Sequence, residues 1–189
     1  ARLQGRPTQE LLTYYVIERW LARLEASPYA SAFVLKGGVL LAALGARRTT
    51  VDADLLGQNL SSEEENLKLV IREVAQMSLA VDDGMIYDPA TIEAEVIREG
   101  DHYAGLRISM NAFLATAKLK LRLDINFGDP VTPAPQPVRL PSLREELPDV
   151  NLHGYPIETI LAEKLCTAMT LGIANTRIRD YVDIYTLIT

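Results

Sequence analysis

Cysteine and long apolar stretches are scarce in this sequence of 189 residues. Cys166 is the only cysteine, so no disulfide bond can form within the chain, as is usual in a reducing compartment. Because Cys166 lies in an apolar helical stretch, we expect a packed thiol rather than a nucleophile. No apolar run approaches the roughly 20 residues that cross a membrane, and residues 1–10 show no signal-peptide pattern. These absences predict a cytoplasmic protein with no membrane partner.

The charge balance argues against one class of interaction. The formal net charge is −6, which disfavours broad, sequence-independent affinity for nucleic acid. Any nucleic acid would therefore have to bind a local basic patch. The hydrophobic content of 48% and the chain length predict one well-buried core, alone or with a small helical appendage.

The most informative stretch begins at the glycine pair of Lys36-Gly37-Gly38. The pattern around it predicts a strand over residues 33–36, a glycine turn, a short helix over residues 39–44 and a second strand over residues 51–55. Glycines at the start of a helix let backbone N–H groups approach a ligand closely, and a helix N-terminus favours an anion. We therefore expect this segment to hold a phosphate group.

Two carboxylates follow in the second of these strands. Asp52 and Asp54 occupy alternate positions, so they project from one face of the strand about 7 Å apart. Carboxylates placed together repel each other unless a cation lies between them, and Mg²⁺ prefers such hard oxygen ligands. The pair predicts a magnesium site beside a phosphate site. The alternative is that both side chains are merely solvated on an exposed strand.

Further helices and strands follow from the periodicity of apolar residues. A helix with a buried Trp20 and a cap at Thr8 is expected over residues 10–24 as part of the scaffold, and a second over residues 63–79, capped by Ser61 or Ser62. Three strands are expected over residues 91–97, 106–113 and 118–127.

The strand over residues 118–127 carries chemistry as well as core residues. Its apolar residues alternate with Lys118, Lys120, Arg122, Asp124 and Asn126. If this strand lies beside the Asp52 strand, Asp124 becomes a third carboxylate, and three carboxylates can hold two metal ions for phosphoryl transfer. The alternative is an ordinary half-exposed strand of mixed charge.

The chain divides near a proline-rich stretch. Five prolines lie between residues 130 and 141, which predicts a semi-rigid connector over residues 131–141. We expect a sheet-bearing core over residues 1–130 and a helical C-terminal part over residues 142–189. The helical part contains predicted helices over residues 156–171, ended by Gly172, and residues 176–188.

Four segments in this order resemble the motifs of a known family. They are Lys36-Gly37-Gly38 through Arg48-Thr49-Thr50-Val51-Asp52-Ala53-Asp54, then residues 121–125, residues 157–165, and Arg177-Ile178-Arg179-Asp180-Tyr181-Val182-Asp183. Together they are similar to the AbiEii family of nucleotidyltransferase toxins, and most similar to its mycobacterial Men-type members. The resemblance implies a mixed α/β fold like that of DNA polymerase β, with a mixed sheet flanked by helices and a helical C-terminal part.

The resemblance also assigns roles to residues. It implies metal binding by Asp52, Asp54 and Asp124 and places Arg48 in the shaping of the first motif. It also implies roles for two further residues in catalysis and nucleotide binding. Lys164 contacts the triphosphate, and Asp180 is the essential acid. On the residues alone, Lys164 and Asp180 could equally form exposed ion pairs of little energetic value.

Two more positions complete the expected site. Arg179 stands where the family usually has lysine, and its guanidinium can still hold a phosphate. Thr50 corresponds to a hydroxyl that is phosphorylated in relatives, which implies a kinase-type antitoxin as a partner. A phosphate there would repel the incoming triphosphate.

The implied function is that of a toxin in a toxin–antitoxin pair. Its Men-type relatives use a nucleoside triphosphate and Mg²⁺ to add pyrimidine nucleotides to the 3′ end of tRNA, which blocks aminoacylation and hence translation. Two alternatives stay open on the sequence. The acceptor could be a protein or small-molecule hydroxyl, or the chain could be a catalytically idle protein that binds RNA or an antitoxin.

Overall fold

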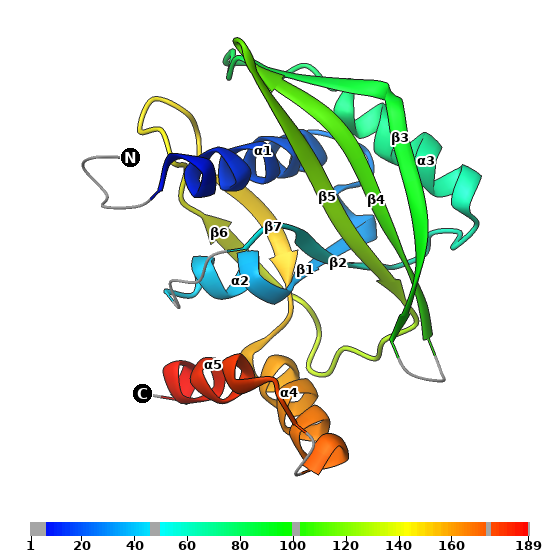
Figure 1. Ribbon diagram of the computed structural model, residues 1–189, viewed down its shortest axis with the longest axis vertical. Coiled ribbons are helices and arrows are strands. Elements are labelled where there is room, and N and C mark those ends of the chain that lie inside the picture. Colours follow the sequence, from blue (N-terminus) through cyan, green and yellow to red (C-terminus); the bar gives the residue numbers. More distant parts are fainter. Residues whose placement is uncertain (1–6, 46–49, 100–102, 173–174, 189) are drawn as a thin grey trace.

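The computed structural model describes residues 7–45, 50–99, 103–172 and 175–188, which form a mixed sheet with helices on it and beside it (Figure 1). The sheet has seven strands in the order β3-β4-β5-β2-β1-β7-β6. The strands are β1 (Phe33–Lys36), β2 (Ala53–Gly57), β3 (Met85–Glu99), β4 (Tyr103–Leu114), β5 (Ala117–Phe127), β6 (Gln136–Leu140) and β7 (Val150–Gly154). The helices are α1 (Thr8–Glu25), α2 (Gly37–Ala43), α3 (Glu64–Ala75), α4 (Ile157–Leu171) and α5 (Ile178–Ile188), with a 3₁₀ turn at Ala30–Ala32.

The centre of the sheet joins segments that are far apart in the sequence. Strand β2 pairs antiparallel with β1 and parallel with β5, so the Asp52 segment lies beside the 117–127 strand as the sequence predicts. Strands β3, β4 and β5 form an antiparallel meander that extends well beyond β2. The leucines and the isoleucine of β5 are buried, Ala117 and Phe127 are half-buried, and the charged residues of β5 face away from the core.

Helix α1 forms the centre of the core. Its C-terminal two-thirds is buried between the sheet and α3, and Trp20 is fully buried, which confirms its predicted role as scaffold. Neither predicted cap is present. The residue before α1 is Pro7 and the residue before α3 is Glu63, and neither makes a side-chain hydrogen bond to the helix. Ser61 Oγ instead accepts a hydrogen bond from the backbone N–H of Glu63.

The sheet continues through the proline-rich stretch, which differs from the expected division of the chain. Strand β6 lies within residues 131–141 and β7 within the part expected to be helical, where β7 pairs parallel with β1. Strand β6 tolerates Pro137 because it is an edge strand that pairs only with β7, and edge strands can lack a donor. The helices after the sheet therefore begin at Ile157 rather than near residue 142.

Helices α4 and α5 pack against each other at one end of the molecule, away from α1 and α3 (Figure 1). Helix α4 starts after Pro156 and ends at Gly172, whose φ of 50° suits glycine, as the sequence predicts. Only Thr159 and Ile160 of α4 are buried, and Cys166 is exposed, so the expectation of a packed thiol is wrong. No helix in the described residues has the length and apolarity needed to cross a membrane.

Candidate active site

Four charged residues form a row across neighbouring strands. In the sheet register Lys36 of β1 lies opposite Asp54 of β2, Asp54 lies beside Asp124 of β5, and Asp124 lies opposite Arg107 of β4. Partners in adjacent strands project to the same face, so the row reads cation, anion, anion, cation. The juxtaposition of Asp54 and Asp124 that the sequence suggested is therefore present.

The glycine pair leaves room for Asp54. A Cβ atom added at Gly37 would lie 1.8 Å from Asp54 Oδ2, and the φ of Gly37 is +65°. The backbone N–H of Gly38 donates to Asp54 Oδ2 at 3.4 Å. Helix α2 begins at Gly37, two residues earlier than predicted, so both glycines belong to its first turn. In this structure the glycines contact a carboxylate, and their expected role toward a phosphate stays a prediction.

Asp52 comes directly before β2, which begins at Ala53 rather than at residue 51 as the sequence predicts. Its position is fixed by Thr50, whose Oγ1 donates to the Asp52 carbonyl oxygen at 2.8 Å and lies 3.4 Å from Asp52 Oδ1. Thr50 is buried, with 8% of its surface exposed. Its hydroxyl also lies against the α2 turn, since a Cβ at Gly38 would be 2.8 Å from it.

The carboxylates repel one another. Burial, then the charge of Asp52 and then that of Asp124 raise the pKa of Asp54 to about 6, against smaller opposing effects of the Gly38 N–H group and Lys36. A carboxyl group in this position gains from a nearby cation. The neighbouring cations therefore do not offset the repulsion and burial that act on Asp54.

Lys36 turns toward residues that the sequence did not single out. Its Nζ lies 2.9 Å from Asp129 Oδ2 and 3.7 Å from Glu163 Oε1, and 5.4 Å from the centre of the Tyr155 ring. The Tyr155 hydroxyl donates to Asp129 Oδ2 at 3.4 Å, and burial, Glu163 and Asp129 raise its pKa. Only their position after β5 and after β7, at the ends of core strands, could have indicated Asp129 and Tyr155.

A second cluster joins α4 to α5. Lys164 Nζ lies 2.7 Å from Asp180 Oδ1 and 2.8 Å from Asp183 Oδ2. Arg177 Nε lies 2.9 Å from Asp180 Oδ2. Asp180 and Asp183 are buried and Lys164 is largely so, so these are not the exposed ion pairs considered as an alternative. The spacing of Asp180 and Asp183, one turn of helix apart, is the signal that could have added Asp183 to the site.

One cavity of about 530 Å³ brings both clusters together. Its wall includes eight of the predicted site residues, namely Lys36, Gly37, Gly38, Asp52, Asp54, Asp124, Lys164 and Asp180. Arg177 also lines it, whereas Arg179 is exposed and does not. Thr50 lies behind Asp52, off the cavity wall, and Arg48 lies outside the described residues.

The basic residues of β5 lead away from this cavity. Lys118, Lys120 and Arg122 are exposed on the face that also carries Asp124, but none of them lines the cavity. Lys120 Nζ pairs with Glu93 Oε2 at 3.2 Å. Since a strand rises about 3.3 Å per residue, the basic face extends along β5 rather than around the carboxylates.

The three carboxylates suit a divalent metal by their chemistry, because each offers hard oxygen ligands and because Asp52 and Asp124 raise the pKa of Asp54. Within the described ranges, however, no three Asp, Glu, His or Cys side chains are already placed to hold one ion. Both oxygens of Asp124 are already engaged, because Arg107 Nε and Nη2 donate hydrogen bonds to them at 2.8 and 2.6 Å. The donor set fits a metal once Asp124 frees an oxygen.

Two solved structures have the same fold. The crystal structure of JHP933 from Helicobacter pylori is 19% identical, with a TM-score of 0.58, and the match covers 97% of this chain and 67% of that one. The crystal structure of a provisionally assigned nucleotidyltransferase from H. pylori is 20% identical, with a TM-score of 0.56 and coverage of 96% and 69%. These similarities confirm the predicted fold class, a mixed α/β fold with a mixed sheet flanked by helices.

The family follows from the sequence. Residues 19–189 match the family of the nucleotidyl transferase AbiEii toxin of type IV toxin–antitoxin systems, and the chain belongs to this family. No curated protein matches the chain. As a member of this family, the protein is a nucleotidyltransferase of the toxin type, and the family implies a cognate antitoxin.

Proposed function

We propose that this protein transfers a nucleotide from a nucleoside triphosphate to the 3′ end of tRNA in the cytoplasm, in the manner of the Men-type toxins, and so blocks aminoacylation and translation. The observation that carries the proposal is the pair Asp54 and Asp124 on adjacent strands, with Asp52 beside them, in a cavity that also contains Lys36 and Lys164. Acidic ligands facing cationic side chains suit a metal-bound triphosphate.

Asp52, Asp54 and Asp124 would hold Mg²⁺, as one or two ions. Bound Mg²⁺ supplies charge neutralisation for the triphosphate and lowers the pKa of the attacking hydroxyl. The 3′ hydroxyl would give its proton to a carboxylate of the site, and its oxygen would bond to the α-phosphorus. The bond from the α-phosphorus to the oxygen that bridges it to the β-phosphorus would break, and pyrophosphate would leave. The chain contributes mainly position and charge to such a reaction.

The cations on the opposite wall would hold the triphosphate. Lys164 faces the cavity from α4, and Asp180 and Asp183 fix its ammonium group there. Arg177 adds a guanidinium from the residue before α5, where the sequence pointed to Arg179. We propose Lys164 and Arg177 as triphosphate contacts, with Asp180 as the residue that positions both.

The acceptor would approach over the exposed face of β5. Lys118, Lys120 and Arg122 form a line of cations on the same face as Asp124 and can neutralise RNA phosphates. Pyrimidine nucleotides are proposed as donors on the Men-type resemblance alone. Transfer to a protein or small-molecule hydroxyl uses the same carboxylates and is the main alternative. An idle RNA- or antitoxin-binding protein is disfavoured, because an idle fold gains nothing from repelling carboxylates.

The test is nucleotide transfer by the purified protein. Total tRNA, Mg²⁺ and each labelled nucleoside triphosphate in turn are incubated with the wild type, Asp54→Ala and Glu145→Gln, an exposed carboxylate outside the cavity. We expect label on the tRNA 3′ end with one or two nucleotides, lost in Asp54→Ala and kept in Glu145→Gln. Label on protein, or none with any nucleotide, would overturn the tRNA assignment.

Regulation by phosphorylation at Thr50 is a second part of the proposal. The Thr50 hydroxyl lies beside Asp52, so a phosphate there would add negative charge to the carboxylates and repel the triphosphate. Its burial means that a kinase-type antitoxin would have to open the segment before β2. Intact mass after incubation with the antitoxin and ATP is expected to rise by one phosphate in the wild type and not in Thr50→Val.

A further inference from the structure

Arg107 lies outside the four sequence motifs, yet it makes the closest contacts to one of the three carboxylates. Its guanidinium donates through Nε and Nη2 to Asp124 Oδ1 and Oδ2 at 2.8 and 2.6 Å. This two-point geometry is the strongest form of an arginine–carboxylate pair, and it uses both oxygens of Asp124. A metal ion needs at least one of them.

The surroundings of Arg107 show why it pairs with Asp124. It lies opposite Asp124 on β4 and is 41% exposed, whereas the Asp124 side chain is 15% exposed. Asp54 and Asp52 form no ion pair in the described part of the chain, and Lys36, opposite Asp54, pairs with Asp129 instead, so Arg107 is the cation that is paired directly with this group of carboxylates. Its exposure leaves it room to swing into solvent when another cation takes its place.

We infer that Arg107 is a built-in counter-cation that holds Asp124 while no metal is bound and competes with a divalent cation for it. The inference rests on the metal site of the proposed function. It predicts that the ion pair and the metal exclude each other at one or both oxygens of Asp124. Removing the guanidinium should then strengthen metal binding, the opposite of what a residue that orients a ligand would do.

The experiment measures Mn²⁺ binding by electron paramagnetic resonance and calorimetry. The variants are Arg107→Gln, Arg107→Lys, which keeps the charge without the planar fork, and Asp54→Asn. Arg139→Gln is the matched control, because it removes another arginine–aspartate pair, with Asp149, at the far edge of the sheet on β6. A second readout is the melting temperature with and without Mn²⁺.

We expect Arg107→Gln to bind Mn²⁺ at least about fivefold more tightly than the wild type, as for two cations coupled through one ligand, with Arg107→Lys in between. Arg139→Gln should match the wild type. The melting temperature of metal-free Arg107→Gln should be lower, and Mn²⁺ should raise it further than in the wild type. If Arg107→Gln does not fold, the smaller increase in affinity expected of Arg107→Lys decides the question.

Two outcomes would overturn the inference, and they separate it from the proposed function. If the wild type binds Mn²⁺, Asp54→Asn does not, and both Arg107 variants bind equally or more weakly, the metal site stands and the competition by Arg107 is wrong. If the wild type and Arg107→Gln bind no Mn²⁺, the metal site is wrong and the inference is wrong with it.

Discussion

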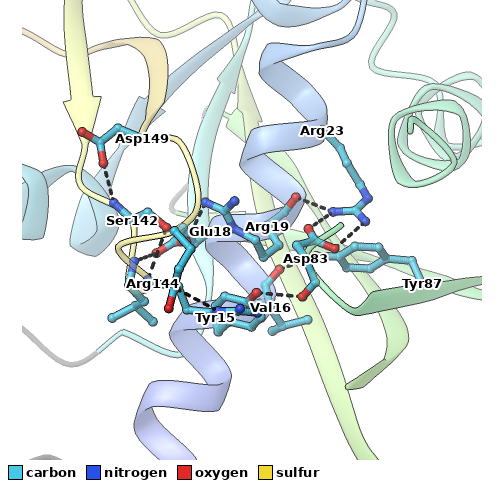
Figure 2. A network of polar contacts seen from close by, with 12 residues as sticks. Tyr15, Val16, Glu18, Arg19, Arg23, Asp83, Tyr87, Ser142, Arg144 and Asp149 are labelled. Atoms are coloured by element: carbon cyan, nitrogen blue, oxygen red, sulfur yellow. Dashed lines mark hydrogen bonds and ion pairs between the residues drawn. The ribbon is translucent and has the colours of Figure 1, made fainter. Parts of the chain in front are cut away.

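Two of the groups of charged side chains in this protein differ in how their charge is compensated. The first, which we call the α1 network, connects α1 to the turn before β3 and to the loop between β6 and β7 (Figure 2). The Asp83 carboxylate accepts hydrogen bonds from Nη1 and Nη2 of Arg23 at 2.6 and 3.0 Å. Glu18 Oε1 lies 2.6 Å from Arg19 Nη2, and Glu18 Oε2 accepts the backbone N–H of Leu143 at 2.8 Å.

The second group is the set of carboxylates in the cavity. In the part of the chain that the structure describes, Asp54 forms no ion pair and accepts a single hydrogen bond, from the Gly38 N–H group. Among the described residues, Asp124 pairs with Arg107, and the Asp52 carboxylate has only the Thr50 hydroxyl as a partner, at 3.4 Å.

In the α1 network Asp83 is matched by a two-point pair with Arg23, and Glu18 by Arg19, although the Arg19 guanidinium itself has no hydrogen-bond partner in the described part of the chain. In the cavity, three carboxylates stand beside one directly paired arginine. The first group joins parts of the fold, and the second is the kind of arrangement that is common at functional sites.

The largest effect should come from a neutral substitution in the α1 network. Asp83→Asn keeps the size of the side chain but leaves Arg23 buried without its anion. Breaking a buried pair costs about 3 to 5 kcal/mol in free energy of unfolding, measured by urea denaturation. Lys68→Ala, which removes a solvent-exposed pair with Glu64 and Glu65 on α3, should change the free energy of unfolding far less. Equal losses would contradict the distinction between paired burial and surface charge.

The same substitution in the cavity should have the opposite sign. Asp54→Asn removes a charge whose pKa is about 6 instead of the usual 3.8, so it should stabilise the metal-free protein at pH 7 by about 2 to 3 kcal/mol. It should also abolish Mn²⁺ binding and nucleotide transfer. Denaturation in the presence of EDTA is the measurement. A destabilised Asp54→Asn would mean that Asp54 is compensated like Asp83, and the comparison would be wrong.

The raised pKa of Asp54 should also appear in the pH dependence of the free energy of unfolding. Between pH 3.8 and about 6 the folded state keeps a proton on Asp54 that the unfolded state has lost. The stabilisation that Asp54 provides is therefore full below pH 3.8 and is lost as pH rises through 6. The excess stability of Asp54→Asn over the wild type should grow by about 1 kcal/mol per pH unit in this window and then level off. A constant difference from pH 4 to 7 would refute the raised pKa.

Much of the cavity could be predicted from the sequence because its residues lie in short segments with clear local patterns. The two strands joined by α2 follow from the glycines and the alternation around them, and Asp124 follows from the alternation in β5. Lys164 and Asp180 came from the order of the family's motifs rather than from any local pattern. These features need no knowledge of how distant segments meet.

The rest depends on long-range pairing that no local pattern encodes. Arg107 became important only because β4 pairs with β5 in a register that places it opposite Asp124. Asp129, Tyr155 and Lys36 meet across three separate segments. The continuation of the sheet into β6 and β7 was hidden by proline, which signals a connector in most contexts but is tolerated on an edge strand.

The smallest expected change in stability isolates the contact between the glycine turn and Asp54. Gly37 and Gly84 both have positive φ, +65° and +72°, so alanine at either should cost a similar backbone strain of about 1 to 2 kcal/mol. Their surroundings differ, because a Cβ at Gly37 would overlap Asp54 Oδ2 while one at Gly84 would reach only Leu114 at 3.4 Å. Gly37→Ala must therefore displace the Asp54 carboxylate, and Gly84→Ala must not.

We expect both alanine variants to unfold at slightly lower urea concentrations and only Gly37→Ala to lose Mn²⁺ binding. Loss in both would assign the effect to general destabilisation. Retention in both would mean that the carboxylate can move aside and still bind the ion, so that the close approach of Gly37 would matter for packing alone. A difference confined to metal binding would separate the demands of the fold from those of the site, since the two glycines share a backbone conformation and differ in the neighbour that a side chain would meet.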